Sequence, residues 1–187
     1  SFLRLDSASA SLNSPTAWNN TAPNSTTFSV GTLVDTNTAN SMIAYAFAEV
    51  PGFSKFGSYT GNASSDGPFV YTGFKPRWIM IKGASVTSDW LIIDTARQPY
   101  NVNQKGLFAD LSIAEEDSIN NTVDVLSNGF KLRTANGGPN QSGTFIYAAF
   151  AETGMIPVVS STSTTQSGSS NLEDVTVTPG DTIATID

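Results

Sequence analysis

Cysteine and histidine are both absent from this chain of 187 residues. Their absence excludes disulfides, thiolate nucleophiles, the usual zinc sites and a Ser-His-Asp catalytic triad. No apolar run approaches the roughly 20 residues that a membrane-spanning helix needs. The first residue is Ser1 and no signal peptide is visible, so we expect a processed product or a piece of a longer polypeptide.

Charged residues are also scarce, at 13% of the chain, which is about half the usual share. The nine basic residues are scattered among 16 acidic ones, and the net charge is −7. Binding to nucleic acid works through neutralised phosphates, and binding to anionic membranes needs a basic cluster. We therefore expect no nucleic-acid partner and no membrane insertion.

Serine, threonine, asparagine and glycine supply the polarity instead, while hydrophobic residues make up 39% and aromatic residues 10%. This composition allows a real core in one domain or two small ones. It is typical of all-β extracellular or virion proteins rich in turns, rather than of cytosolic enzymes.

Two short stretches have nearly the same sequence: MIAYAFAE at residues 42–49 and FIYAAFAE at residues 145–152. Both are apolar on the two alternating sides of an extended chain, which predicts central strands covered on both faces. A buried helix is the alternative, because alanine favours helices. Short length, aromatic content and flanking turn residues favour the strand. We interpret Glu49 and Glu152 as strand ends that reach solvent.

Other features recur in the same order at a spacing of about 103 residues, among them LRLD at residues 3–6 and LFAD at residues 107–110. We interpret residues 1–52 as the C-terminal half of a preceding repeat or as a first β-module. Residues 53–157 would be a complete β-module. Residues 158–187 would be a Ser/Thr-rich linker and a short β tail, with a hairpin formed around Pro179 and Gly180.

The fold class that we predict is all-β, with tandem antiparallel β-sandwich-like modules. The strands expected at residues 77–82 and 90–95 should lie side by side and antiparallel. Further strands are expected at residues 2–6, 27–34, 53–61, 69–72, 123–126 and 130–133.

Acidic side chains are the first candidates for chemistry. Glu115, Glu116 and Asp117 form a cluster that, with Asp66 or Asp94, could in principle run glycoside hydrolysis. Adjacent residues cannot flank a sugar bond at the required separation, so a solvated loop is the favoured interpretation. We therefore assign no catalytic, cofactor-binding or metal-binding residue, and the ligand-binding residues are unknown.

Aromatic side chains are the second set of candidates. Trp18, Trp78 and Trp90 could stack on glycans, but we expect Trp78 and Trp90 to belong mainly to the core. Tyr59 and Tyr71 are better placed near loops. Oxygen-rich loops at residues 64–67 and 136–142 could hold calcium, although no EF-hand pattern is present.

The stretch AYAFAEVPGFSKFGSYTGNASSDGPFVYTGFKPRWIMIK, followed by DW, LSNGFKLR and IYAAFAE, resembles a repeated module of tail and tail-fibre proteins of marine bacteriophages. That module is a domain of unknown function and brings no catalytic residues. The resemblance covers residues 53–152, and residues 2–50 as the end of a preceding copy.

The resemblance implies a structural virion component of a bacteriophage, a tail fibre, tail tip or surface fibre, and not an enzyme. Such a protein would self-assemble, as a trimer by our guess, contact other virion proteins and present a surface to the host. A glycan- or receptor-binding module at a fibre end is the alternative, and a polysaccharide-degrading tailspike is a third interpretation.

Overall fold

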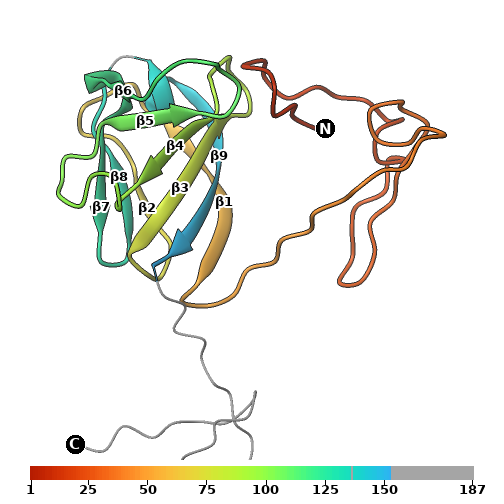
Figure 1. The fold of residues 1–187 in the computed structure, drawn as a ribbon, viewed down its shortest axis with the longest axis horizontal. Helices are drawn as coiled ribbons and strands as arrows, with labels where there is room; N and C mark the ends of the chain where they lie inside the picture. The colour runs from red at the N-terminus through yellow and green to blue at the C-terminus, as the bar shows by residue number, and fades with distance from the viewer. Residues whose placement is uncertain (136, 153–187) are drawn as a thin grey trace, which may run out of the picture.

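The computed structural model describes residues 1–135 and 137–152, and it divides the chain into a β-sandwich and an N-terminal arm (Figure 1). The sandwich runs from Ser54 to Ala151, and the arm, residues 1–53, precedes it. The predicted tail at residues 158–187 lies outside the described residues.

The larger sheet has six strands in the order β1-β9-β3-β4-β5-β6, and every pairing is antiparallel. Its strands are β1 (Ser54–Gly61), β9 (Gly143–Ala151), β3 (Pro76–Gly83), β4 (Leu91–Asp94), β5 (Lys105–Phe108) and β6 (Glu116–Asp117).

The smaller sheet has three antiparallel strands in the order β2-β8-β7. Its strands are β2 (Phe69–Tyr71), β8 (Gly129–Leu132) and β7 (Val123–Leu126). Two short 3-10 helices, η1 (Ile119–Asn121) and η2 (Gly138–Asn140), lie in the loops beside it. Two antiparallel sheets around one core confirm the predicted all-β, sandwich-like class.

β9 is the strand around which the sandwich is built, because it pairs with β1 on one side and with β3 on the other. Phe145, Tyr147 and Ala149 point into the core and are 7% exposed or less. Alternation along the strand sends Ile146, Ala148 and Phe150 to the opposite face. The strand prediction for this stretch is therefore confirmed, and the helix alternative is wrong.

Aromatic rings fill the space between the two sheets. Tyr59 of β1 stacks on Phe145 with ring centroids 5.4 Å apart, and Phe130 of β8 meets Tyr147 edge-on at 5.4 Å. Ile79 and Ile81 of β3 and Leu132 of β8 complete the same buried cluster. These contacts join strands that are distant in sequence, so they hold the two layers together.

The predicted strands of the sandwich are confirmed within one or two residues, including the antiparallel pairing of β3 with β4. In the arm the strand predictions are wrong. Residues 2–6, 27–34 and 42–49 form no strand, and only the isolated bridges Phe2–Leu12 and Val50–Ser54 occur there. An extended apolar segment forms a strand when neighbouring strands pair with its backbone groups. β9 finds them in β1 and β3, whereas residues 42–49 find none within the described chain.

The arm is fixed to the sandwich at its start and at its end. Near its start, the Ser11 amide donates to the Ala84 carbonyl (2.8 Å) and the Ser88 amide donates to the Ala8 carbonyl (3.0 Å). At its end, the Val50 amide donates to the Ser54 carbonyl (3.2 Å). Between these points the arm leaves the sheet and returns to it (Figure 1).

Candidate functional site

The first candidate site is the outer face of the six-stranded sheet, meaning the face turned away from the three-stranded sheet. It holds a hollow of about 290 Å³ lined by uncharged residues, most of them apolar. The lining residues are Phe56, Gly57, Met80, Trp90, Ile146, Tyr147 and Ala148. No charged side chain is among them, so the hollow suits an apolar partner.

At one end of the outer face, five aromatic rings gather. Phe150 lies at the centre, with its ring centroid 5.6 Å from Trp78, 5.7 Å from Phe56 and 6.0 Å from Phe53. Phe47 from the arm joins at 6.2 Å from both Phe56 and Phe150. The arm therefore touches the outer face here through two rings, those of Phe47 and Phe53.

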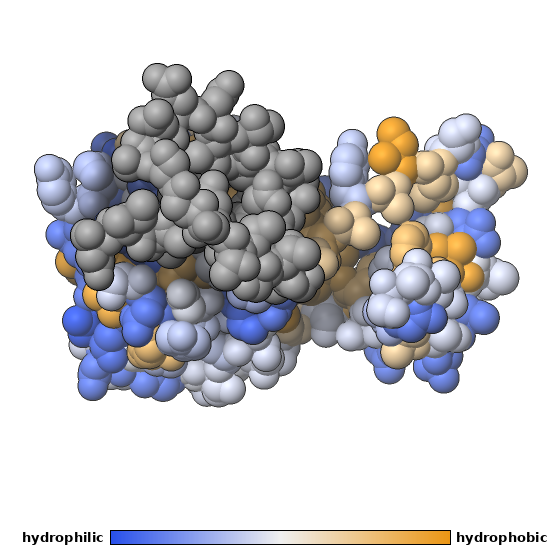
Figure 2. All heavy atoms as spheres, turned by 90° about the horizontal axis from the view of Figure 1, so that it is seen from below, coloured by the Kyte–Doolittle hydropathy of each residue, from blue (hydrophilic) through white to orange (hydrophobic). Residues whose placement is uncertain are grey.

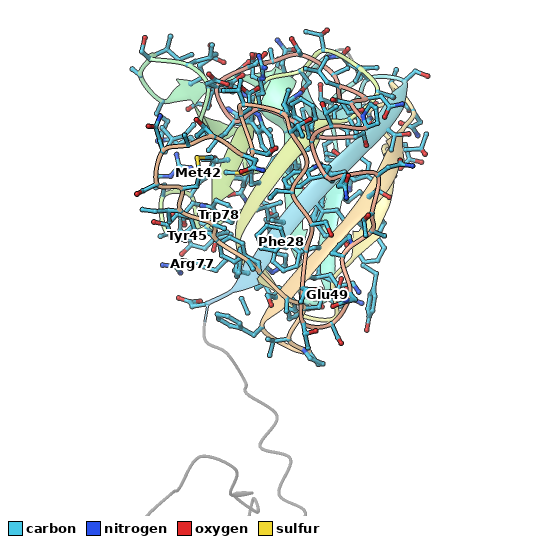
Figure 3. All side chains as sticks on the ribbon, turned by 90° about the vertical axis from the view of Figure 1, so that its right-hand side faces the viewer. Phe28, Met42, Tyr45, Glu49, Arg77 and Trp78 are labelled. Carbon is cyan, nitrogen blue, oxygen red and sulfur yellow. The ribbon has the colours of Figure 1, made fainter. Side chains whose placement is uncertain are left out.

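The arm carries the most exposed hydrophobic residues near this face. Tyr45 is 82% exposed, Ile43 81% and Phe47 70%. Figure 3 shows Met42, Tyr45 and Phe28 of the arm in front of the outer face, and Figure 2 shows hydrophobic residues gathered on the arm. Contiguous exposed apolar surface on a soluble protein marks an interaction site.

β1 forms an open edge next to this surface. It pairs with β9 along its whole length, while its other side, among residues 1–135 and 137–152, meets only the bridge from Val50 to Ser54. Glu49 covers the start of that side, accepting from the Phe56 amide at 3.3 Å and from Lys55 Nζ at 2.7 Å. The Lys55 ammonium is the main cause that lowers the pKa of the Glu49 carboxyl.

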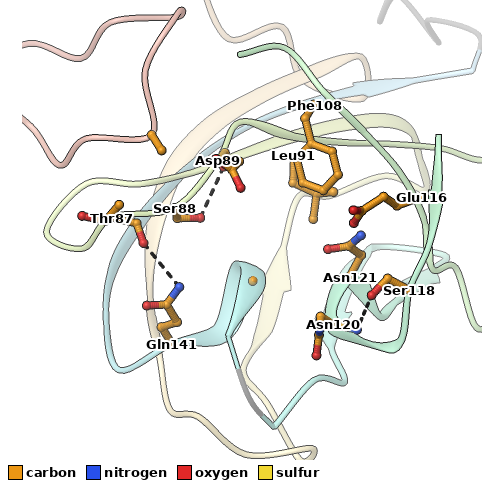
Figure 4. Close-up of a pocket in the computed structure, with 12 residues that line it drawn as sticks. Thr87, Ser88, Asp89, Leu91, Phe108, Glu116, Ser118, Asn120, Asn121 and Gln141 are labelled. Carbon is orange, nitrogen blue, oxygen red and sulfur yellow. Dashed lines mark hydrogen bonds between the residues drawn. The ribbon is translucent and has the colours of Figure 1, made fainter. Parts of the chain in front are cut away.

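The second candidate site is a polar pocket of about 270 Å³ at the other end of the sandwich (Figure 4). Carboxylates, amides and hydroxyls line most of it, with Phe108 and Leu91 as its apolar wall. Asn121 is 4% exposed, and its side-chain Nδ2 has no hydrogen-bond partner in the described part of the chain. A buried donor without a partner is costly, so the pocket has a place for an acceptor atom.

Asp89, at the pocket wall, faces a second carboxyl group. Burial raises the pKa of Asp89, and the negative charge of Asp110 raises it further. Lys82 acts in the opposite direction, but its Nζ is engaged by the carbonyls of Ser9 (2.8 Å), Gly83 (2.9 Å) and Ala8 (3.1 Å). The pocket is thus an environment that favours neutral ligands over anions.

The carboxylates proposed from sequence for hydrolysis lie in separate ion pairs. Asp66 pairs with Lys131 at 2.8 Å, Asp94 pairs with Arg77 at 3.6 Å, and Glu115 pairs with Arg97. Glu116 and Asp117, expected in a solvated loop, instead form the two-residue strand β6, in which both are exposed. Of these five, only Glu116 lines the polar pocket.

The aromatic candidates are distributed differently from the expectation. Trp78 and Trp90 are half-buried on the outer face rather than in the core, because Ile79 and Ile81 occupy the inner side of β3. Tyr59 is a core residue whose hydroxyl donates to the Pro139 carbonyl at 2.5 Å, so it does not lie at a loop surface. Tyr71 is 63% exposed, as expected.

Sequence reasoning missed the polar pocket. Its residues come from the loop before β4, from β5 and β6, and from the two 3-10 helices, and no local motif joins them. Within residues 1–135 and 137–152, no group of three or more Asp, Glu, His or Cys side chains could hold a metal ion. No helix in the described chain has the length and hydropathy to cross a membrane.

The geometry defines a small antiparallel β-sandwich with an extended N-terminal arm. Residues 1–154 match the family described as a domain of unknown function (DUF7483), and the chain belongs to that family. No curated protein and no solved structure matches the chain.

Proposed function

We propose that this protein is a structural, non-enzymatic building block that self-assembles, and that it serves as a tail-fibre, tail-tip or surface-fibre component of a bacteriophage virion. The observation that supports self-assembly is the uncovered apolar surface formed by the outer face and the arm. The virion location rests on the sequence resemblance and on the low charge content.

The free energy of self-assembly can be judged from the apolar area that association would bury. Each Å² of apolar surface removed from water contributes about 25 cal/mol, and specific interfaces bury about 800 Å² on each partner. The outer face and the arm together offer two Trp, several Phe and a Tyr, which are the residue types that carry most binding energy at interfaces. The lining of the hollow carries no charge, so covering it requires no desolvation of ions there.

The test is the oligomeric state of the chain and of an outer-face variant. Ile146 lies on the outer face and is 36% exposed. Ile146→Lys places a charge in the apolar hollow, and we expect it to shift the protein towards monomer in sedimentation velocity. Tyr100→Ser is the matched control, because Tyr100 is 81% exposed but lies outside the hollow. A wild-type protein that stays monomeric at high concentration would contradict self-assembly.

The virion location has its own test. Antibodies against the sandwich, or mass spectrometry of purified particles, should detect the chain in intact virions from the source. Absence from particles that contain all other structural proteins would remove this part of the proposal.

A second candidate function is glycan binding at the polar pocket. The unpartnered Nδ2 of buried Asn121 favours it, together with the carboxylates of Asp89 and Glu116 and the ring of Phe108 along the same wall. Planar amide and carboxylate groups can bond neighbouring sugar hydroxyls, while an aromatic face covers the C–H side of the sugar.

A glycan array probed with the wild-type protein and with Asn121→Ala tests this candidate. Binding of a neutral saccharide that the variant loses would support it. Asp117→Asn is the control, because Asp117 belongs to β6 but does not line the pocket. No bound glycan on the array, or equal binding by all three proteins, would contradict it.

A further inference from the structure

We infer that residues 42–49 of one chain, here called the apolar segment, add as a β-strand to the open edge of β1 in a second copy of the chain. This inference rests on the proposed self-assembly and names the contact that would produce it.

The first step is the sequence of the apolar segment. MIAYAFAE differs little from FIYAAFAE, which begins at Phe145 and runs through the rest of β9. In the sandwich, that stretch supplies six of the eight antiparallel residue pairs between β9 and β1, from Ser54–Phe150 to Tyr59–Phe145. The apolar segment is therefore of the sequence type that β1 accepts as a neighbour.

The second step is the state of the apolar segment in a single chain. It is extended, yet within the described part of the chain the backbone of residues 38–47 makes no hydrogen bond. Ile43, Tyr45 and Phe47 share one side of the extended chain and are each at least 70% exposed. Both the backbone groups and the apolar side chains would gain partners by joining a sheet.

The third step is the edge that would receive the segment. Within the described part of the chain β1 is paired along one side, and its sequence SKFGSYTG contains a single charged residue, Lys55. Proteins commonly protect edge strands from unwanted pairing with charges or proline. Lys55 forms an ion pair with Glu49 of its own chain, and the remainder of β1 carries neither a charge nor a proline.

The fourth step explains why the receiving edge belongs to another copy. Val50 faces Ser54, so a fold-back along the same edge would continue as a hairpin and put residue 47 opposite Gly57. Phe47 instead lies against Phe56 and Phe150 on the outer face. The segment of the same chain thus crosses the outer face and leaves its own edge open.

Identical chains can associate through this contact without a further partner, because each copy supplies one apolar segment and one β1 edge. Repetition of such a contact closes into a ring when the rotation between copies permits it. The outer face and its hollow lie beside β1, so the same contact would also cover apolar surface there.

A proline substitution separates this inference from general apolar association. Ala46→Pro removes one backbone N–H from the segment and disfavours its pairing, while Ile43, Tyr45 and Phe47 remain. Ala46 is exposed, so the sandwich should fold normally, and an unchanged melting temperature checks this. We expect association at least tenfold weaker than in the wild type, and unchanged association in the control Ala46→Ser.

Hydrogen exchange measured at several protein concentrations supplies the second readout. Strand addition predicts that residues 42–49 and 54–61 gain protection together as the oligomer forms. If Ala46→Pro associates like the wild type while Ile146→Lys does not, the inference fails and the proposed function stands. If residues 42–49 are protected in the monomer, the segment folds back on its own β1 and the inference also fails. If neither substitution matters because the wild type is monomeric, both fail.

Discussion

At the scale of single residues, Lys82 is the most unusual side chain of the sandwich. It is 0% exposed, and its ammonium group donates to three backbone carbonyls, two of which belong to the arm. Burial lowers the pKa of Lys82, while the charges of Asp110 and Asp89 act to raise it. Hydrogen bonds to a charged donor are stronger than neutral ones, so this one side chain fixes the start of the arm to β3.

Replacing Lys82 by methionine keeps most of the stem volume and leaves the three carbonyls without this donor. We expect a loss of about 3 kcal/mol in the free energy of unfolding, and faster proteolysis within residues 1–12. Urea unfolding and limited proteolysis measure the two effects. Lys105→Met is the control, since Lys105 is partly exposed and its ion pair with Glu115 spans 3.7 Å. Equal losses of unfolding free energy in the two variants would show that the hydrogen bonds of Lys82 contribute no more to stability than the ion pair of Lys105.

Asp89 yields a prediction about pH. Burial and the nearby Asp110 raise the pKa of Asp89 above its ordinary value of about 3.9. The folded state therefore binds the proton of the Asp89 carboxyl more tightly than the unfolded state does. The stabilisation that this binding gives the folded state is fully present at low pH. It is lost as the pH rises through the raised pKa. At neutral pH the ionised Asp89 opposes folding, mainly because burial disfavours its charge and further because Asp110 and Glu116 repel it, while Lys82 attracts it.

Asp89→Asn should therefore stabilise the protein at pH 7, by up to about 1 kcal/mol, which is the scale of a partly exposed charge interaction. At pH 3 the two proteins should unfold at nearly the same urea concentration, because Asp89 is then protonated in both states of the wild type. The measurement is urea unfolding at both pH values. A stability difference that is the same at pH 3 and pH 7 would refute the electrostatic cause.

At the scale of elements, the loops at one end of the sandwich are joined by a buried amide. Asn140, in η2, is 0% exposed. Its Nδ2 donates to the carbonyls of Ser64 (2.7 Å) and Thr134 (2.9 Å), and its Oδ1 accepts from the Asn62 amide (3.0 Å). One side chain thereby ties the loop after β1 to the loop after β8.

Asn140→Ala would leave these buried backbone groups without partners. We expect a loss of about 3 kcal/mol in the free energy of unfolding, with the two loops exchanging amide protons faster than the strands. Asn120→Ala is the matched control, because Asn120 is exposed and its side chain makes none of these bonds. Equal stability of Asn140→Ala and the control would mean that water replaces the amide.

The same scale shows what the sequence could predict. β3 is found from alternation, and β9 from its short apolar and aromatic sequence between turn residues, because the fold buries one side of each strand, such as Ile79 and Ile81. The apolar segment has an equally strong pattern, yet it forms no strand. The sequence pattern shows that a segment is able to pair as a strand. Whether it does so depends on an available neighbouring strand, which the rest of the fold or another chain must supply.

The candidate sites differ in the same way. The outer face could be anticipated in part, because alternation along residues 77–82 puts Trp78 and Met80 on the same side of the strand, opposite Ile79 and Ile81. The polar pocket could not be anticipated. Asp89, Phe108 and Asn121 are separated by long loops, and only the topology brings them together. Of the tandem modules, one sandwich is seen, and the assignment of residues 1–52 to a second module stays a prediction.

At the scale of the whole molecule, two forces act against each other in self-association. Each chain carries a net charge of −7, so copies repel one another at neutral pH. The outer face and the apolar segment attract mainly through apolar contact, since the lining of the hollow has no charged side chain and the apolar segment has one, Glu49. Repulsion acts over distance and is screened by salt, whereas apolar contact is not.

Salt should therefore strengthen association in this protein. Raising NaCl from about 20 mM to about 300 mM shortens the screening length from roughly 20 Å to roughly 6 Å, and we expect the dissociation constant to fall a few-fold. Cooling should weaken association, because apolar contacts lose driving force at low temperature. Sedimentation velocity at two salt concentrations and at 5 °C and 25 °C measures both effects. An interface held by ion pairs would give the opposite response to salt, because screening would then remove the attraction and leave the apolar surface uncovered.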